Sequence, residues 1–115
     1  MYRLIHDGDS IGNTQLERGD PAELTVSGVF NNVGGAKPLA GWIKSVGGEE
    51  DKGVVFIALN DEFTLLDKAD NAIKFSDAHL IAVPDDDEAY LDISVSQEDY
   101  NTYFAEHISA LSDDA

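Results

Sequence analysis

Apolar and polar residues alternate along several short segments of the chain, and Gly, Pro, Asn or Asp bounds most of these segments. Alternation with a period of two is typical of β-strands that bury one face. On this pattern we expect strands at residues 2–6, 10–16, 23–30, 63–66, 72–75, 79–83 and 90–95. The continuous apolar run Val54–Leu59 predicts a central strand, and Asp7-Gly8-Asp9 predicts a hairpin turn. Residues 18–21 and 49–53 are expected to be a loop and an exposed connector, and helix remains a possible alternative for any single short run.

Two segments have helical periodicity instead. Leu39, Trp42, Ile43 and Val46 have the spacing i, i+3, i+4, i+7, with a Pro at 38 and a Gly pair at 47–48. A proline suits the first turn of a helix and a glycine its end, so a short helix is predicted over about residues 38–46.

The second helix is predicted over about residues 97–111 at the C-terminal end of the chain. Ser96 is a typical N-cap with Asp99 three residues later, and apolar side chains follow on one face from Tyr100 to Leu111. Residues 113–115 are expected to form a frayed acidic tail after a single domain of residues 1–112. Strands, a short helix, more strands and a final helix indicate an α+β fold, with a largely antiparallel sheet on which the C-terminal helix packs.

Catalytic and metal-binding patterns are not found in the 115 residues. The chain has no cysteine, no phosphate-binding loop and no nucleophile elbow, and its three histidines have no zinc-binding spacing. His107 falls on the apolar face of the second helix, where a lone histidine is most often a satisfied core residue. His6 with Asp7 and Asp9 could hold a metal, although a polar hairpin tip explains the same residues. We therefore expect neither an enzyme nor a cofactor.

The net charge is the most unusual property of the sequence. Seven basic and 23 acidic residues give a formal charge of −16, and residues 58–115 carry fifteen of the acids with only two lysines. Such a field repels nucleic acid and anionic membranes and steers basic proteins toward the chain. Direct nucleic-acid binding is accordingly disfavoured, whereas a basic protein partner is expected. The alternative is that the acidity serves only solubility or adaptation to salt.

Most of the candidate partner-binding residues lie between Pro84 and the start of the second helix. They are acids that could meet a basic surface, together with one aromatic side chain that could anchor it. The set is Asp85, Asp86, Asp87, Glu88, Tyr90, Asp92, Glu98 and Asp99. For each acid the competing interpretation is a solvated side chain on a negative surface. Removing these charges is expected to leave the fold nearly intact.

Two resemblances bear on function. The pattern His6-Asp7-Gly8, Ile11-Gly12, Leu16-Glu17, Gly19-Asp20-Pro21 and Gly28-Val29-Phe30 resembles one found in small uncharacterised bacterial proteins, and it covers only residues 1–30. In size and acidity the chain resembles immunity proteins of bacterial toxin systems, including contact-dependent growth inhibition. That resemblance implies a cytoplasmic protein that neutralises a basic, nuclease-type toxin by covering its active site.

Two further classes remain open. A nucleic-acid mimic, such as an anti-restriction or anti-CRISPR protein of a phage, would use the same negative field with acids spaced like phosphates. A small structural or assembly domain would instead scatter its acids on all sides. No segment has the length of apolar sequence that a membrane span or a signal peptide needs, so a cytoplasmic location is expected.

Overall fold

The computed structural model describes residues 1–32 and 34–107, which form an α+β fold with a largely antiparallel sheet. The strands are β1 (Tyr2–His6), β2 (Asp9–Thr14), β3 (Arg18–Asp20), β4 (Thr25–Asn31), β5 (Glu49–Asp51), β6 (Val54–Ala58), β7 (Phe63–Leu66), β8 (Ala72–Ile73), β9 (Asp77–Val83) and β10 (Glu88–Ser94). The helices are α1 (Ala36–Ser45), the 3₁₀ turn η1 (Pro84–Asp86) and α2 (Gln97–Tyr103). None of the helices in this part of the chain is long and apolar enough to cross a membrane.

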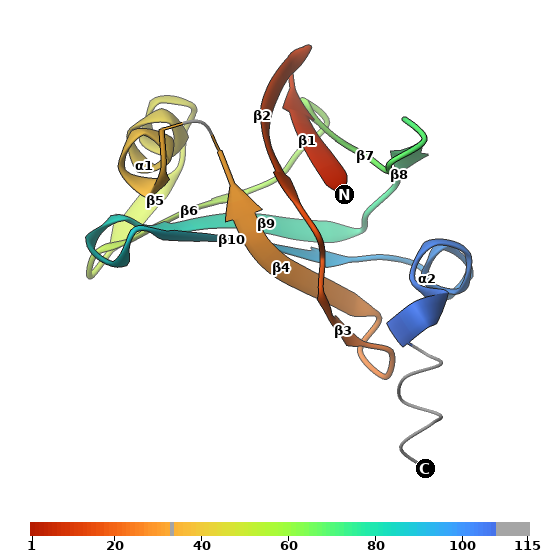
Figure 1. Cartoon of the computed structure of the whole chain (residues 1–115). Helices are drawn as coiled ribbons and strands as arrows, with labels where there is room; N and C mark the ends of the chain where they lie inside the picture. The colour runs from red at the N-terminus through yellow and green to blue at the C-terminus, as the bar shows by residue number, and fades with distance from the viewer. Residues whose placement is uncertain (33, 108–115) are drawn as a thin grey trace.

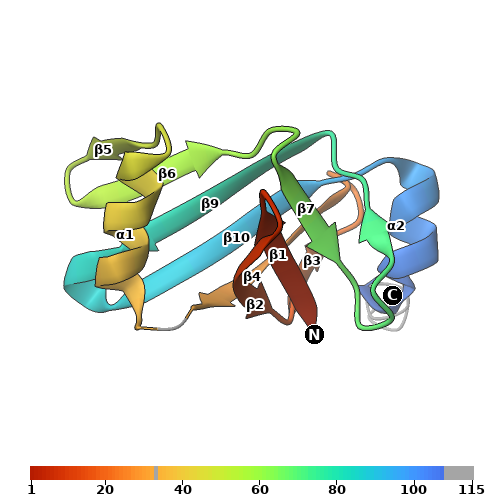
Figure 2. The same cartoon turned by 90° about the horizontal axis from the view of Figure 1, so that it is seen from above.

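The strands run in the order β5-β6-β9-β10-β4-β2-β1-β7-β8, and every pairing is antiparallel. β4 is the junction of the sheet, because its C-terminal end pairs with β2 and its N-terminal half pairs with β3. Strands β2, β1, β7 and β8 cross over one face of the β6-β9-β10-β4 layer, with α1 and α2 at the two ends (Figures 1 and 2). The core is therefore enclosed between the two parts of the sheet and the helices.

Local sequence explains the bend beside β4. Leu16 has a φ of 46°, and the Thr14 hydroxyl accepts a hydrogen bond from the Leu16 N–H at 3.2 Å. The Glu17 carboxylate accepts a bond from the Val29 N–H at 2.9 Å, at the point where β4 changes partner. Gly28 leaves room for both side chains, since a Cβ there would lie 2.7 Å from Thr14 Oγ1 and 2.7 Å from Glu17 Oε2.

The expected hairpin turn and the end of the first helix are confirmed. Asp7 and Gly8 both have positive φ between His6 and Asp9, which is the backbone of a type I′ turn. α1 ends at Ser45, just before the predicted Gly pair; Gly47 has a φ of 103°, and the Gly48 N–H donates to the Ile43 carbonyl at 2.8 Å. Pro38 lies in the first turn of α1, but the helix starts two residues before the predicted position.

The C-terminal helix predicted over about residues 97–111 is present, but the structure interrupts it. The Ser96 hydroxyl does cap α2, accepting from the Asp99 N–H at 3.2 Å, but the helix stops at Phe104, whose φ is −125°. The break accompanies complete burial of the Phe104 ring, which lies 5.8 Å from the ring of Tyr2. Residues 105–107 are helical again, and the remainder of the predicted helix and the acidic tail at 113–115 lie outside the described residues.

Three assignments of strands are corrected. Residues 18–20 pair with β4, and residues 49–51 pair with β6, although both had been expected to lack regular structure. The run Val54–Leu59 gives β6, but this strand is second from an edge of the sheet, and β10 and β4 occupy its centre. Backbone pairing makes β3 and β5 strands even though every one of their side chains is exposed.

Candidate functional site

One face of the layer formed by β5, β6, β9, β10, β4 and β3 is not covered by any described element. α1, β1, β2 and β7 all lie on the opposite side of this layer (Figure 1). The ion pair between Lys44 of α1 and Glu50 of β5, 3.2 Å long, identifies the side on which the helix packs. We call the other side the outer face.

The pairing register places four apolar side chains next to one another on the outer face. Phe56 pairs with Ile81, Ile81 with Tyr90, and Tyr90 with Val29, on four neighbouring strands. None of the four belongs to the core or to the partly buried side chains that pack against it. Val29 is 43% exposed, and the other three are partly exposed. We call these residues the apolar row.

Acidic side chains flank the apolar row on the same face. The alternation of each strand and its register put six exposed acids there, and Arg18 is the basic residue among these strand positions. The acids are Asp20, Glu49, Asp51, Asp77, Glu88 and Asp92. The row beside the apolar row contains Ala58, His79, Asp92, Ser27 and Arg18. Glu88 and Asp92 therefore lie on opposite sides of Tyr90 along β10.

Asp85 and Asp86 form the turn that joins β9 to β10, and both are exposed. Asp85 approaches the tip of the β5–β6 hairpin, because its Oδ2 would be 3.7 Å from a Cβ at Gly53. Together with Asp51 and Glu88 these residues place four acids at one corner of the outer face, which we call the acidic corner.

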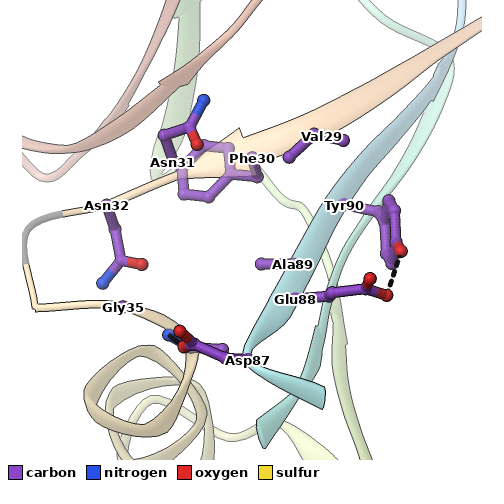
Figure 3. Close-up of a pocket in the computed structure, with 10 residues that line it drawn as sticks. Val29, Phe30, Asn31, Asn32, Gly35, Asp87, Glu88, Ala89 and Tyr90 are labelled. Carbon is purple, nitrogen blue, oxygen red and sulfur yellow. Dashed lines mark hydrogen bonds between the residues drawn. The ribbon is translucent and has the colours of Figure 1, made fainter.

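Asp87 has a structural role. Its φ of 52° places it in the left-handed region, and its Oδ1 accepts a hydrogen bond from the Ala36 N–H at 3.1 Å. Gly35, the N-cap residue of α1, provides no side-chain cap of its own. Figure 3 shows Asp87 directed toward Gly35, whereas Glu88 and Tyr90 extend to the other side of β10. The expectation that charge removal leaves the fold nearly intact therefore does not extend to Asp87.

Glu88 and Tyr90 interact with each other on the outer face. The Tyr90 hydroxyl donates a short hydrogen bond to Glu88 Oε2 (Figure 3). That bond raises the pKa of Tyr90 above its ordinary value, with a further contribution from the negative charge of Asp86. The phenol therefore stays a neutral hydrogen-bond donor and holds the Glu88 carboxylate beside the apolar row. Both residues also line a shallow pocket of about 260 Å³ between the end of β4 and the start of α1.

The structure does not gather all the predicted site residues in one place. Glu98 and Asp99 are in the first turn of α2, which follows the C-terminal end of β10, whereas Asp85 and Asp86 precede its N-terminal end. Seven residues of strand separate the two groups by about 23 Å. Glu98 and Asp99 also lie at the positive end of a helix, where acids are favourable without any partner.

The acids of the outer face have no cationic partner among the described residues. Among the described residues the ion pairs are Arg3–Asp70, His6–Glu62 and Lys44–Glu50, and all three lie off the outer face or at its edge. The outer-face carboxylates therefore have their charge available to another molecule.

The histidines adopt two different environments. His107 donates to the Leu16 carbonyl at 3.0 Å, as expected of a satisfied packing residue. His6 was expected at a polar hairpin tip, but its ring lies between Trp42 and Phe63, with centroid distances of 5.1 and 4.6 Å. Over residues 1–32 and 34–107, no group of three or more His, Asp or Glu side chains is arranged to hold a metal ion.

Sequence analysis proposed Tyr90 as an aromatic anchor, but it did not identify the other three residues of the apolar row or the acids of β5 as part of a site. The relevant signal was the unbroken apolar sequence of β6, since a strand that is apolar at every position is normally covered on both faces. The run that contains Phe56 was therefore predicted to be a central strand. Searches against protein families, curated proteins and solved structures found no match to the chain. Function therefore has to be inferred from the chain's own residues.

Proposed function

We propose that this chain is an acidic, non-catalytic binding protein whose outer face binds a basic protein. The observation that supports the proposal best is the group of unpaired carboxylates at the acidic corner and along β10, on a sheet face that no described element covers. Carboxylates that form no ion pair with another described residue steer a basic surface to this face and orient it there.

In its more specific form, the partner is a nuclease-type bacterial toxin and the chain is its cytoplasmic immunity protein. A nuclease presents a basic surface to its nucleic-acid substrate, and an acidic protein that covers this surface excludes the substrate. The size and charge of the chain suit that role. No catalytic group is needed for it.

The geometry favours a protein partner over mimicry of nucleic acid. A mimic needs carboxylates repeated like phosphates along its contact surface. Here Glu88 and Asp92 are separated by Tyr90, in the middle of four apolar side chains that correspond to nothing on a phosphate backbone. An apolar centre with a charged rim is the usual anatomy of a protein–protein interface.

The proposal is tested with the triple variant Asp86→Asn, Glu88→Gln, Asp92→Asn, which leaves the structural Asp87 intact. We expect the wild-type chain to bind and inhibit a basic nuclease domain encoded by a neighbouring gene, with an affinity that falls as salt rises. Calorimetric titration at low salt should show at least about tenfold weaker binding by the triple variant.

A matched control removes three acids elsewhere. Asp9→Asn, Glu23→Gln and Asp61→Asn change the net charge equally. All three residues are exposed and lie outside the acidic corner, Asp9 at the start of β2 and the other two in turns. The control should retain most of the affinity. An equal loss of affinity in both triple variants would indicate that binding depends on net charge alone. The proposal would be refuted if the wild-type chain showed no salt-dependent binding to any basic nuclease domain tested.

A further inference from the structure

We infer that the apolar row is the centre of the docking surface, and that the partner presents an apolar ridge flanked by lysine or arginine side chains. This inference rests on the proposed function and specifies the chemistry of the partner. It is carried by an apolar surface that the described fold leaves without a cover, and by the sign of the charges around that surface.

The first step is the composition of the two strands that carry half of the apolar row. In β6, Val55 is buried on the inner side, yet Val54 and Phe56 on the outer side are apolar as well. In β9, Leu80 is buried while Ile81 and Val83 are also apolar. Strands exposed to water on one face normally alternate apolar with polar residues, whereas strands covered on both faces do not. β6 throughout, and β9 in its C-terminal half after the outer residues Asp77 and His79, therefore have the sequence of covered strands and only one covered face.

The second step is the size of the surface. The six strands, spaced about 4.8 Å apart, span roughly 24 Å, and the three longest of them, β9, β10 and β4, are each roughly 23 Å long at about 3.3 Å per residue. An interface of ordinary size removes about 800 Å² from each partner. Because side chains make the accessible area larger than its flat projection, one partner seated on the outer face can form such an interface.

The third step is the negative charge around the apolar row, which determines what kind of molecule can bind there. Five acids surround the apolar row on its own strands and on β5, namely Glu49, Asp51, Asp77, Glu88 and Asp92. Two copies of this chain joined through the row would bring these like charges together, which costs stability. A partner with basic side chains around an apolar centre would instead pair with the acids at the rim and cover the apolar row. We therefore propose a partner of this kind.

The experiment uses two disulfide-cyclised β-hairpin peptides of equal positive charge as probes. Both carry lysines at the ends of one face. The first has Val and Tyr at the centre of that face, and the second has Thr at those positions. Binding to the full chain is measured by fluorescence anisotropy at low and high salt. The apolar hairpin should bind at least about fivefold more tightly than the threonine hairpin, and the advantage should persist at high salt.

The matched variants are Ile81→Thr on the outer face and Ile5→Thr on β1. Both residues are partly exposed isoleucines on strands, and both changes keep a β-branched side chain. Ile81→Thr should abolish the preference for the apolar hairpin, while Ile5→Thr should leave it unchanged. Thermal unfolding of each variant verifies that the fold is retained.

The outcomes separate this inference from the proposed function. Equal, salt-sensitive binding of both hairpins, unaffected by Ile81→Thr, would overturn the apolar docking centre and leave the acidic binding function standing. No binding of either hairpin at low salt would count against both. Self-association of the wild-type chain at high salt, lost in Ile81→Thr when measured by sedimentation, would show that a second copy occupies the row and would also overturn the inference.

Discussion

Substitution of Asp87 tests whether this residue stabilises the fold rather than binding a partner. Asp87→Ala removes the acceptor for the Ala36 N–H at the start of α1, and the loss of such a cap costs about 0.5–2 kcal/mol. Asp87 also has a φ of 52°, a conformation that costs an ordinary L-residue about 1–2 kcal/mol and is easier for Asp or Asn. Together these terms predict a loss of about 1.5–4 kcal/mol in the free energy of unfolding.

Two further substitutions separate the cap from the backbone. Asp87→Asn keeps an oxygen acceptor and tolerance of the left-handed region, and loses only the favourable charge at the helix terminus, worth about 0.3–1 kcal/mol. Asp87→Gly relieves the backbone but removes the cap, so its stability should fall between those of the Asn and Ala variants. Urea unfolding followed by the fluorescence of Trp42, the chain's only tryptophan, reports on α1 directly. If the Ala and Asn variants are equally stable, the Asp87 side chain does not cap the helix.

Two other predictions concern the core side of the fold. Gly28→Ala should cost about 1–3 kcal/mol in urea unfolding, because the new Cβ would lie 2.7 Å from both Thr14 Oγ1 and Glu17 Oε2, whereas Gly41→Ala in open space on α1 should stabilise the helix by about 0.5–1 kcal/mol. If Gly28→Ala leaves the free energy of unfolding unchanged, the hydrogen bonds of the Glu17 and Thr14 side chains do not maintain the bend beside β4. Burial raises the pKa of Tyr100, so the folded state keeps this proton longer than the unfolded state does, and the resulting stability is complete below about pH 10 and declines as the pH rises beyond it. Tyr100→Phe should weaken that decline. It should also cost about 0.5–1.5 kcal/mol of stability at neutral pH, because the hydrogen bond to the Thr25 carbonyl at 3.2 Å is lost. A chemical-unfolding series from pH 8 to 11 in which the variant and the wild type lose stability equally with pH would contradict the assignment.

The sequence predicted the structure best where local sequence preferences and tertiary packing favour the same conformation. Asp7-Gly8 produces its turn through backbone preferences that neighbours do not alter, and Gly47-Gly48 ends α1 for the same reason. In β4 the alternation that buries Val26 and Phe30 was visible from residue types alone. Such elements need no knowledge of distant contacts.

Elements that depend on distant partners were missed. β3 and β5 have no apolar residue, so only their pairing with β4 and β6 makes them strands. The helical spacing of Phe104 suggested an unbroken helix, but packing of its ring against Tyr2, a hundred residues away, accompanies the break. Likewise, the order of strands that places β6 near an edge cannot be obtained from its composition.

The candidate site, too, was predicted only where local sequence was sufficient. The acids from Asp85 to Asp92 were identified by composition, but composition could not distinguish Asp87, which faces α1, from Glu88, which faces outward. It also grouped Glu98 and Asp99 with residues at the far end of β10, because neighbours in sequence at the two ends of a strand are not neighbours in space. The register of four strands was needed to align Phe56, Ile81, Tyr90 and Val29.

The separation of charge from apolar surface on the outer face has a physical consequence for binding. Carboxylates buried without partners cost several kcal/mol each, whereas carboxylates at a solvated rim keep their hydration and act over about 8–10 Å. Glu88 and Asp92 lie at such a rim and Tyr90 lies between them, so under the proposed function the acids would determine how fast and in which orientation a basic protein arrives. Under the same proposal the apolar row would act only at contact, where removal of its surface from water would determine how slowly the partner leaves. Solubility alone would account for the acids but not for the apolar row beside them, whereas the proposed function accounts for both features.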